Sequence, residues 1–171
     1  APMPSVLVRL AKDMPFYGWY RVLVEDFSNR PYEDKLRDPN VNVKYSGVDV
    51  AIDRVLEHIR EAGPYDVLLG FSQGCILIHL LTAVLRQRRE VPPWKVSLLF
   101  SGMGVRDQRH RHLFLPPLEQ PAIMVFGKQD EYYSYGVESQ TRLYENPIIF
   151  EHDEGHKFPS ATESAGQVYS G

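Results

Sequence analysis

The stretch that decides the fold runs from residue 65 to residue 81 and reads YDVLLGFSQGCILIHLL. It opens with an apolar run of strand length, Val67 to Phe71, and closes with an apolar segment long enough for a helix. Between them stands a Gly-x-Ser-x-Gly pentapeptide at residues 70–74. Strand, pentapeptide and helix in this order are typical of a nucleophile elbow, with Ser72 at its tip.

The glycines of the pentapeptide have a physical explanation. An elbow reverses the chain over about three residues and holds its serine in a strained backbone conformation. We therefore predict that side chains at Gly70 and Gly74 would collide across the turn. Ser72 would stand at the carboxyl end of the strand, above the positive end of the next helix. The pentapeptide alone also occurs by chance in ordinary tight turns, so its weight comes from the strand and helix around it.

Length and composition set the outer limits. The 171 residues suit one domain with a single core, so we expect residues 1–171 to form one partial domain. The chain is 43% apolar and 12% aromatic, as globular proteins are, and its net charge of −3 gives no electrostatic case for nucleic acid. Cys75 is the only cysteine, which excludes an intrachain disulfide and a cysteine-based metal cluster. We expect Cys75 to be buried.

No apolar run approaches the ~20 residues that span a bilayer, and the first residues lack the pattern of a secretion signal. A cytoplasmic protein is therefore expected. The chain opens with Ala1 rather than methionine, and we expect it to begin partway through something larger. Oligomeric state is not indicated by any pattern.

Further apolar runs predict the rest of the architecture. An amphipathic helix is expected from Val48 to the Gly63-Pro64 breaker, and strands are expected at residues 96–101, 121–127 and 147–151. The helix after the elbow is apolar nearly all round, so it should be covered by other structure. Short buried strands alternating with crossovers predict an α/β fold, with a mainly parallel sheet and helices on both faces.

The remaining segments are less regular. Residues 27–40 and 102–117 are predicted to be loops, and the second holds a basic cluster that we expect to be solvated: Arg106, Arg109, His110, Arg111 and His112. Ser5 to Leu10 fits a short strand or one helical turn, and residues 160–171 read as an unfinished helix. An aromatic patch from Met14 to Tyr20 is expected to pack on the domain surface or to wall a pocket.

Three candidate catalytic residues each follow a predicted strand. Ser72, Asp130 and His156 would converge where the carboxyl ends of parallel strands meet. Their order along the chain is that of an α/β-hydrolase. His156 would take the proton of the Ser72 hydroxyl, and Asp130 would orient the imidazole and stabilise its charged form. The backbone N–H of Gln73 would donate to the oxyanion, and an acyl-enzyme would form and be hydrolysed.

Other residues compete for these roles. His152 lies four residues before His156, and Asp153 is nearer to both histidines than Asp130 is. His156 is preferred because Gly155 would give its loop freedom to aim the ring. Asp130 is preferred to Glu131 and Asp107 because it comes directly after a predicted strand and glycine.

Three motifs resemble the FSH-type serine hydrolase family of the α/β-hydrolase superfamily. They are Gly-Pro-Tyr-Asp-Val-Leu-Leu-Gly-Phe-Ser-Gln-Gly at 63–74, the strand and glycine before Asp130, and Glu-Gly-His-Lys-Phe-Pro at 154–159. Gly18-Trp19 and Ala1-Pro2 are similar to further elements of that family. The resemblance implies an esterase or thioesterase with the triad Ser72, Asp130 and His156, without a metal or organic cofactor. It implies a small acyl ester or thioester substrate and a cytoplasmic or nuclear location.

The family opens with a strand that ends in Leu-His-Gly or a similar motif, and the loop after it gives a second oxyanion donor. Nothing upstream of Ser72 matches that motif, so the resemblance implies an N-terminally incomplete domain. Acyl-protein thioesterases also carry Gly-Phe-Ser-Gln-Gly, although the 154–159 motif fits them less well. A second alternative is a binding module that keeps the fold without the chemistry.

Overall fold

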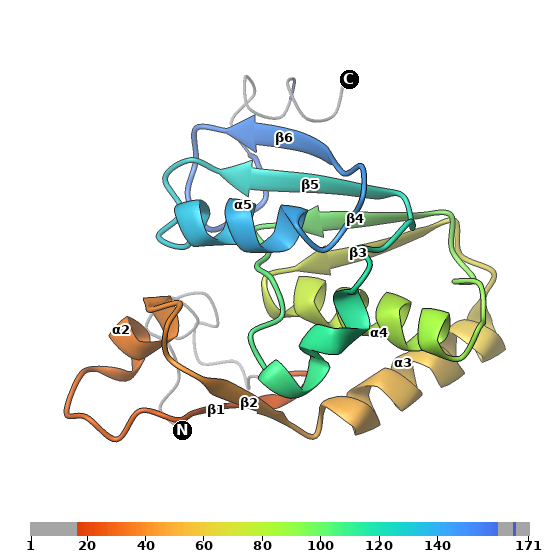
Figure 1. Cartoon of the computed structure of the whole chain (residues 1–171). Coiled ribbons are helices and arrows are strands. Elements are labelled where there is room, and N and C mark those ends of the chain that lie inside the picture. Colours follow the sequence, from red (N-terminus) through yellow and green to blue (C-terminus); the bar gives the residue numbers. More distant parts are fainter. Residues whose placement is uncertain (1–16, 161–165, 167–171) are drawn as a thin grey trace.

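The protein is represented by a computed structural model that describes residues 17–160 and 166. Its main sheet is parallel and four-stranded, in the order β3-β4-β5-β6 (Figure 1). The strands are β3 (Val67–Phe71), β4 (Val96–Phe100), β5 (Ala122–Gly127) and β6 (Ile148–His152). The four predicted strands are therefore confirmed, each to within one residue at either end.

Two helices follow the predicted pattern. α3 (Val48–Ala62) begins after Gly47, whose φ of 81° places it in the left-handed region, and ends where the Gly63 N–H donates to the Ile59 carbonyl. No side chain caps the start of α3. α4 (Gln73–Gln87) is buried on nearly every side, as its apolar sequence predicts.

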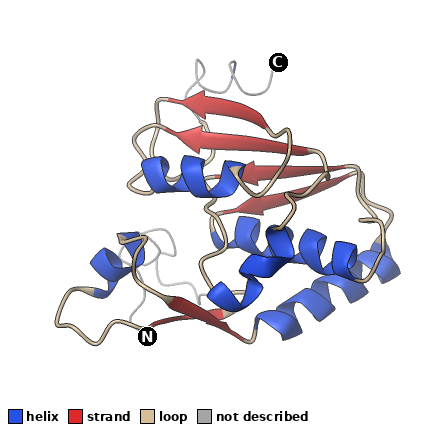
Figure 2. Cartoon of the chain, viewed as in Figure 1, coloured by secondary structure: helices blue, strands red, loops and turns tan. Residues whose placement is uncertain are grey.

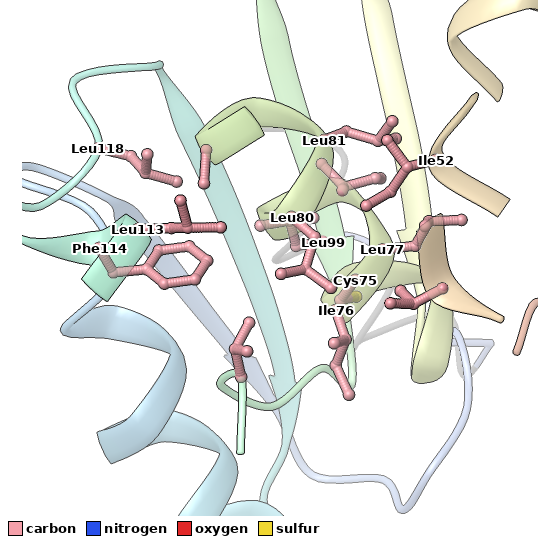
Figure 3. Packing of buried hydrophobic residues seen from close by; sticks show 14 of the residues in the cluster. Ile52, Cys75, Ile76, Leu77, Leu80, Leu81, Leu99, Leu113, Phe114 and Leu118 are labelled. Carbon is pink, nitrogen blue, oxygen red and sulfur yellow. The ribbon is translucent and has the colours of Figure 1, made fainter. Parts of the chain in front are cut away.

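The core lies between α4 and one face of the sheet. Side chains of α4 pack against Leu99 of β4 on one side and against Ile52 of α3 on another (Figure 3). His79 of α4 is fully buried, and its Nδ1 lies 2.9 Å from the Tyr144 hydroxyl. Burial lowers the pKa of His79 to about 3, so this side chain is neutral in the folded protein.

A further helix, α5 (Tyr133–Thr141), packs against β5 on the same face of the sheet as α4 (Figure 2). α5 was not predicted from the sequence, because its apolar residues show almost no helical periodicity. On the opposite face, apolar side chains including Val67, Leu69 and Ile148 are about half exposed.

The amino-terminal part of the described chain forms a second, smaller sheet. β1 (Arg21–Val24) and β2 (Val43–Ser46) are antiparallel, and α2 (Tyr32–Arg37) lies between them in sequence (Figure 1). The prediction of a loop over residues 27–40 is therefore wrong in its centre. α2 has only six residues and buries none of them, so it leaves no apolar stripe in the sequence.

The basic segment is more structured than predicted. Residues 108–114 form the 3₁₀ helix η1 (Gln108–Phe114). Arg106 is buried, and its guanidinium donates to the backbone carbonyls of Leu36, Asp38 and Val41. The expectation of a solvated basic face is wrong for Arg106, which fastens the α2–β2 segment to the loop that follows β4.

Three predictions lie wholly or partly outside the described residues: the strand or turn at Ser5 to Leu10, the first three residues of the aromatic patch at 14–20, and most of the helix at 160–171. Within residues 17–160 and 166, no helix combines the length and the apolar character needed to cross a membrane.

Candidate active site

Ser72 occupies a strained turn between β3 and α4. Its φ of 51° and ψ of −113° lie in a region that residues other than glycine rarely adopt. Its backbone is held from both sides: its N–H donates to the Phe100 carbonyl at 2.9 Å, and its carbonyl accepts from the Cys75 N–H at 3.0 Å. The geometry predicted for a nucleophile elbow is thus present around Ser72.

The two glycines beside Ser72 differ in what they contribute. A Cβ atom on Gly70 would lie 2.8 Å from Ile78 Cδ1 and 2.9 Å from the Cys75 nitrogen, so this position has no room for a side chain. A Cβ atom on Gly74 would meet only Trp19 Nε1, at an ordinary 3.8 Å. The predicted collision is therefore correct for Gly70 and wrong for Gly74.

Asp130 and His156, which follow β5 and β6, are in direct contact. His156 Nδ1 lies 2.7 Å from Asp130 Oδ2, and the two side chains are only 10% and 4% exposed respectively. The other carboxylate oxygen of Asp130 accepts a hydrogen bond from the Tyr132 N–H at 2.9 Å. Because Nδ1 faces the carboxylate, Nε2 is the ring nitrogen left for a reacting group.

Gly127, the last residue of β5, allows this contact to form. A Cβ atom there would lie 2.4 Å from the carbonyl oxygens of both Glu154 and Gly155. The loop after β6 therefore passes directly over the end of β5, and the Gln129 N–H donates to the Glu154 carbonyl at 3.1 Å. A Cβ atom on Gly155 would meet nothing closer than 3.6 Å. The residue that must be glycine for steric reasons is Gly127, and not Gly155, which was expected to give the loop freedom to aim the His156 ring.

The imidazole of His156 also contacts the elbow. Its ring centroid lies 5.1 Å from that of Phe71, the residue before Ser72, and 5.8 Å from that of Tyr132. Among the described residues, no hydrogen bond joins the Ser72 hydroxyl to His156. Catalytic hydrogen bonds are often long without substrate and shorten when it binds.

The competing histidine and its neighbouring carboxylate are engaged elsewhere. His152 is fully buried at the end of β6, and its Nδ1 accepts the Glu154 N–H at 3.2 Å. Burial lowers the pKa of His152. Asp153 points away and pairs with Lys128 at 3.0 Å on the surface.

The competing acidic residues are likewise committed. Glu131 pairs with Arg37. Asp107 accepts the Tyr45 N–H at 2.7 Å and is bonded to the guanidinium of Arg109. Burial alone would raise the pKa of Asp107, but the hydrogen bonds from Arg109 and Tyr45 outweigh it and lower this pKa to about 2.

Gln73 contributes through both its backbone and its side chain. It is the first residue of α4, where backbone N–H groups have no acceptor within the helix. Its side chain reaches to the segment before β1: Oε1 accepts the Trp19 N–H at 3.1 Å, and Nε2 donates to the Tyr20 carbonyl at 3.1 Å. This side-chain role of Gln73 was not predicted, because no local sequence pattern indicates it.

Cys75, in the first turn of α4, is not a competing nucleophile. It is fully buried, its thiol donates to the Phe100 carbonyl at 3.3 Å, and burial raises its pKa.

Comparison with known proteins identifies the family of this chain. The family model described as serine hydrolase (FSH1) matches residues 6–168. The chain belongs to this family. Esterase OVCA2 of Xenopus tropicalis is 28% identical over 144 residues, which are 84% of this chain and 60% of that protein. Esterase C25G4.2 of Caenorhabditis elegans is 32% identical over 126 residues, which are 71% of this chain and 57% of that protein.

This FSH1-family chain thus spans about 60% of the length of those two relatives. Its fold is similar to that of a solved α/β hydrolase, MGS-MChE2, from the metagenome of lagoon sediments at Mar Chica, Morocco. The two share 17% sequence identity at a TM-score of 0.53, over 70% of this chain and 63% of that one. The predicted family and the α/β-hydrolase class of the fold are both confirmed.

Proposed function

We propose that this chain hydrolyses carboxylic esters or thioesters through an acyl-enzyme on Ser72. The observation that carries the proposal is the 2.7 Å contact between His156 and Asp130, beside an elbow that holds Ser72 in a strained conformation. Support comes from family membership and from relatives named as esterases. The substrate class is a small acyl ester or thioester.

The proposed chemistry assigns one task to each residue. Ser72 Oγ attacks the carbonyl carbon while His156 Nε2 takes its proton. The oxyanion forms near the Gln73 N–H, and a single well-aimed donor of this kind contributes about 3 kcal/mol. The intermediate collapses, the leaving alcohol or thiol takes the proton from His156, and an acyl group stays on Ser72. Water then attacks the acyl group by the same route, with Asp130 fixing the imidazole throughout.

A fluorophosphonate probe tests the nucleophile. We expect covalent labelling of the purified chain, and we expect Ser72→Ala to abolish it. The matched control is Ser134→Ala, at an exposed serine of α5, which should be labelled like the wild type. Equal labelling of the Ser72→Ala variant would disprove the proposal, and so would an absence of labelling in the folded wild type.

The aspartate is tested separately by comparing Asp130 with Asp153, which lies three residues before His156 in the chain. Asp130→Asn should lower kcat for a p-nitrophenyl ester by about 10⁴-fold, because the imidazole would be held in the wrong tautomer. Asp153→Asn removes an exposed carboxylate and should change kcat less than twofold. Equal effects of the two substitutions would contradict the role proposed for Asp130. Comparing oxyesters with thioesters of the same acyl group would show which class is preferred.

A further inference from the structure

The loop after β6 carries His156, the proposed general base, and is closed on itself. At its two ends, the Glu154 carboxylate accepts the Ser160 N–H at 2.8 Å and the Ser160 hydroxyl at 3.0 Å. Between them, the Lys157 N–H donates to the Gly155 carbonyl at 2.8 Å, and the Lys157 ammonium pairs with Glu154. Because these bonds make the loop a compact unit, a side chain that anchors one part of it restrains the rest.

Phe158, two residues after His156, anchors this loop to the ends of two strands. Its ring centroid lies 5.0 Å from that of Phe71, the last residue of β3, and 4.7 Å from that of Phe100, the last residue of β4. The ring centroid of Phe71 lies in turn 5.1 Å from that of His156. Aromatic rings at these separations attract one another. A continuous series of ring contacts therefore joins the end of β4 to the imidazole.

The exposure of Phe158 indicates a local role. Phe158 is 41% exposed, whereas Phe100 is only 1% exposed. A half-exposed side chain contributes less to global stability than a fully buried one, because less of its apolar surface leaves water on folding. The two ring contacts of Phe158 are with residues at the carboxyl ends of β3 and β4, where the elbow begins. Loss of the ring should therefore alter the site more than the stability of the fold.

The imidazole needs a restraint of this kind. The bond between His156 Nδ1 and Asp130 Oδ2 fixes one atom of the ring, and the ring can still pivot about that atom. Nε2 is the nitrogen that must reach the Ser72 hydroxyl, and its position then depends on packing. Phe71 limits the pivot through its contact with the imidazole, and Phe158 stacks on Phe71 with 28° between the ring planes. A shift of the Phe71 ring would therefore change where Nε2 can lie.

We propose that Phe158 is a positioning residue of the proposed reaction, which keeps Nε2 of His156 within reach of Ser72 through its contact with Phe71. The inference rests on the proposed function, because the position of Nε2 matters only if Ser72 is the nucleophile. It goes beyond that function by giving a role to a side chain that takes no part in bond making. Loss of the ring slows the chemical step and leaves substrate binding intact.

The test measures kcat and KM for p-nitrophenyl acetate. Phe158→Ala is expected to lower kcat about 10- to 100-fold, since a displacement of about 1 Å can slow catalysis about 100-fold. KM should change less than about threefold, because the lost alignment affects the transition state rather than binding of the ester. Phe158→Tyr keeps the ring contacts and should retain most of the wild-type kcat. The control is Ile149→Ala, at a β6 residue that is 44% exposed, which should preserve kcat.

A double variant tests the route of the effect. If Phe158 acts through Phe71, its loss should matter little once residue 71 is already alanine. The Phe71→Ala/Phe158→Ala variant should therefore have nearly the kcat of Phe71→Ala alone. Losses that multiply in the double variant would show that the two rings act independently and would overturn the inference.

The outcomes for the inference and for the proposed function are distinct. If hydrolysis depends on Ser72 but Phe158→Ala, folded by circular dichroism, keeps the wild-type kcat, the proposed function stands and the inference fails. A raised KM with unchanged kcat would make the ring part of a binding surface and would also overturn the inference. If Phe158→Ala does not fold, Phe158→Leu takes its place; its kcat should fall at least about threefold, and an unchanged kcat contradicts the inference. If no ester is hydrolysed in a Ser72-dependent way, both fail together.

Discussion

The strained backbone of Ser72 predicts that glycine at this position stabilises the fold. A residue other than glycine at φ 51° and ψ −113° costs on the order of 1–3 kcal/mol. Glycine avoids this cost but loses roughly 0.5–1 kcal/mol relative to alanine, since its unfolded chain is more flexible. Ser72 makes no side-chain cap hydrogen bond to α4, so removing its hydroxyl should not destabilise the helix end.

We therefore expect the free energy of unfolding of Ser72→Gly to exceed that of Ser72→Ala by about 1 kcal/mol. This difference should raise its Tm by about 2–4 °C relative to Ser72→Ala. Urea and thermal denaturation of both variants measure this difference. The control pair is Ser134→Gly and Ser134→Ala in the first turn of α5, where the order should reverse because glycine is less favourable than alanine in a helix. If Ser72→Gly is no more stable than Ser72→Ala, the backbone conformation of residue 72 does not cost the free energy that we attribute to it.

Three further predictions concern stability and the alignment of the site. Gly70→Ala should destabilise the fold by about 1–3 kcal/mol in urea because its Cβ has no room, whereas Gly74→Ala should cost less than 1 kcal/mol; equal costs would contradict the collision at residue 70. Gly127→Ala should push the loop of His156 away from β5 and lower kcat at least tenfold, and unchanged kcat in a folded variant would argue against that coupling. Since the folded-state pKa of Asp107 is depressed to about 2, its carboxylate stabilises the fold by about 2 kcal/mol above pH 4, and this contribution is lost as the pH falls toward 2. Asp107→Asn should therefore be less stable than wild type at pH 7, with the gap closing between pH 4 and 2; a gap that does not depend on pH would refute the assignment.

Sequence patterns predicted the parts of this fold that depend on local order. β3, α3 and α4 were found because their apolar residues repeat with strand or helix spacing and their ends carry glycine or proline. α2 and α5 were missed because neither has a clear apolar stripe. β1 and β2 have four residues each, too short for their alternation to stand out.

Some residues of the candidate site could likewise be predicted from local sequence, and others could not. Asp130 and His156 could be proposed from their positions after strands, and the structure places them in contact. The need for Gly127 could not be predicted, since it arises from a loop that crosses β5 from a distant part of the chain. The side-chain bonds of Gln73 to the Trp19–Tyr20 segment also join residues more than fifty positions apart.

The buried guanidinium of Arg106 affects the local unfolding of the amino-terminal part of the described chain. It is bonded to three carbonyls of the 36–41 segment, and a partial separation of that segment would leave a cation inside the protein without acceptors. Amide hydrogens of β1, α2 and β2 should then exchange with solvent at one shared rate, because these three elements would unfold together as one cooperative unit.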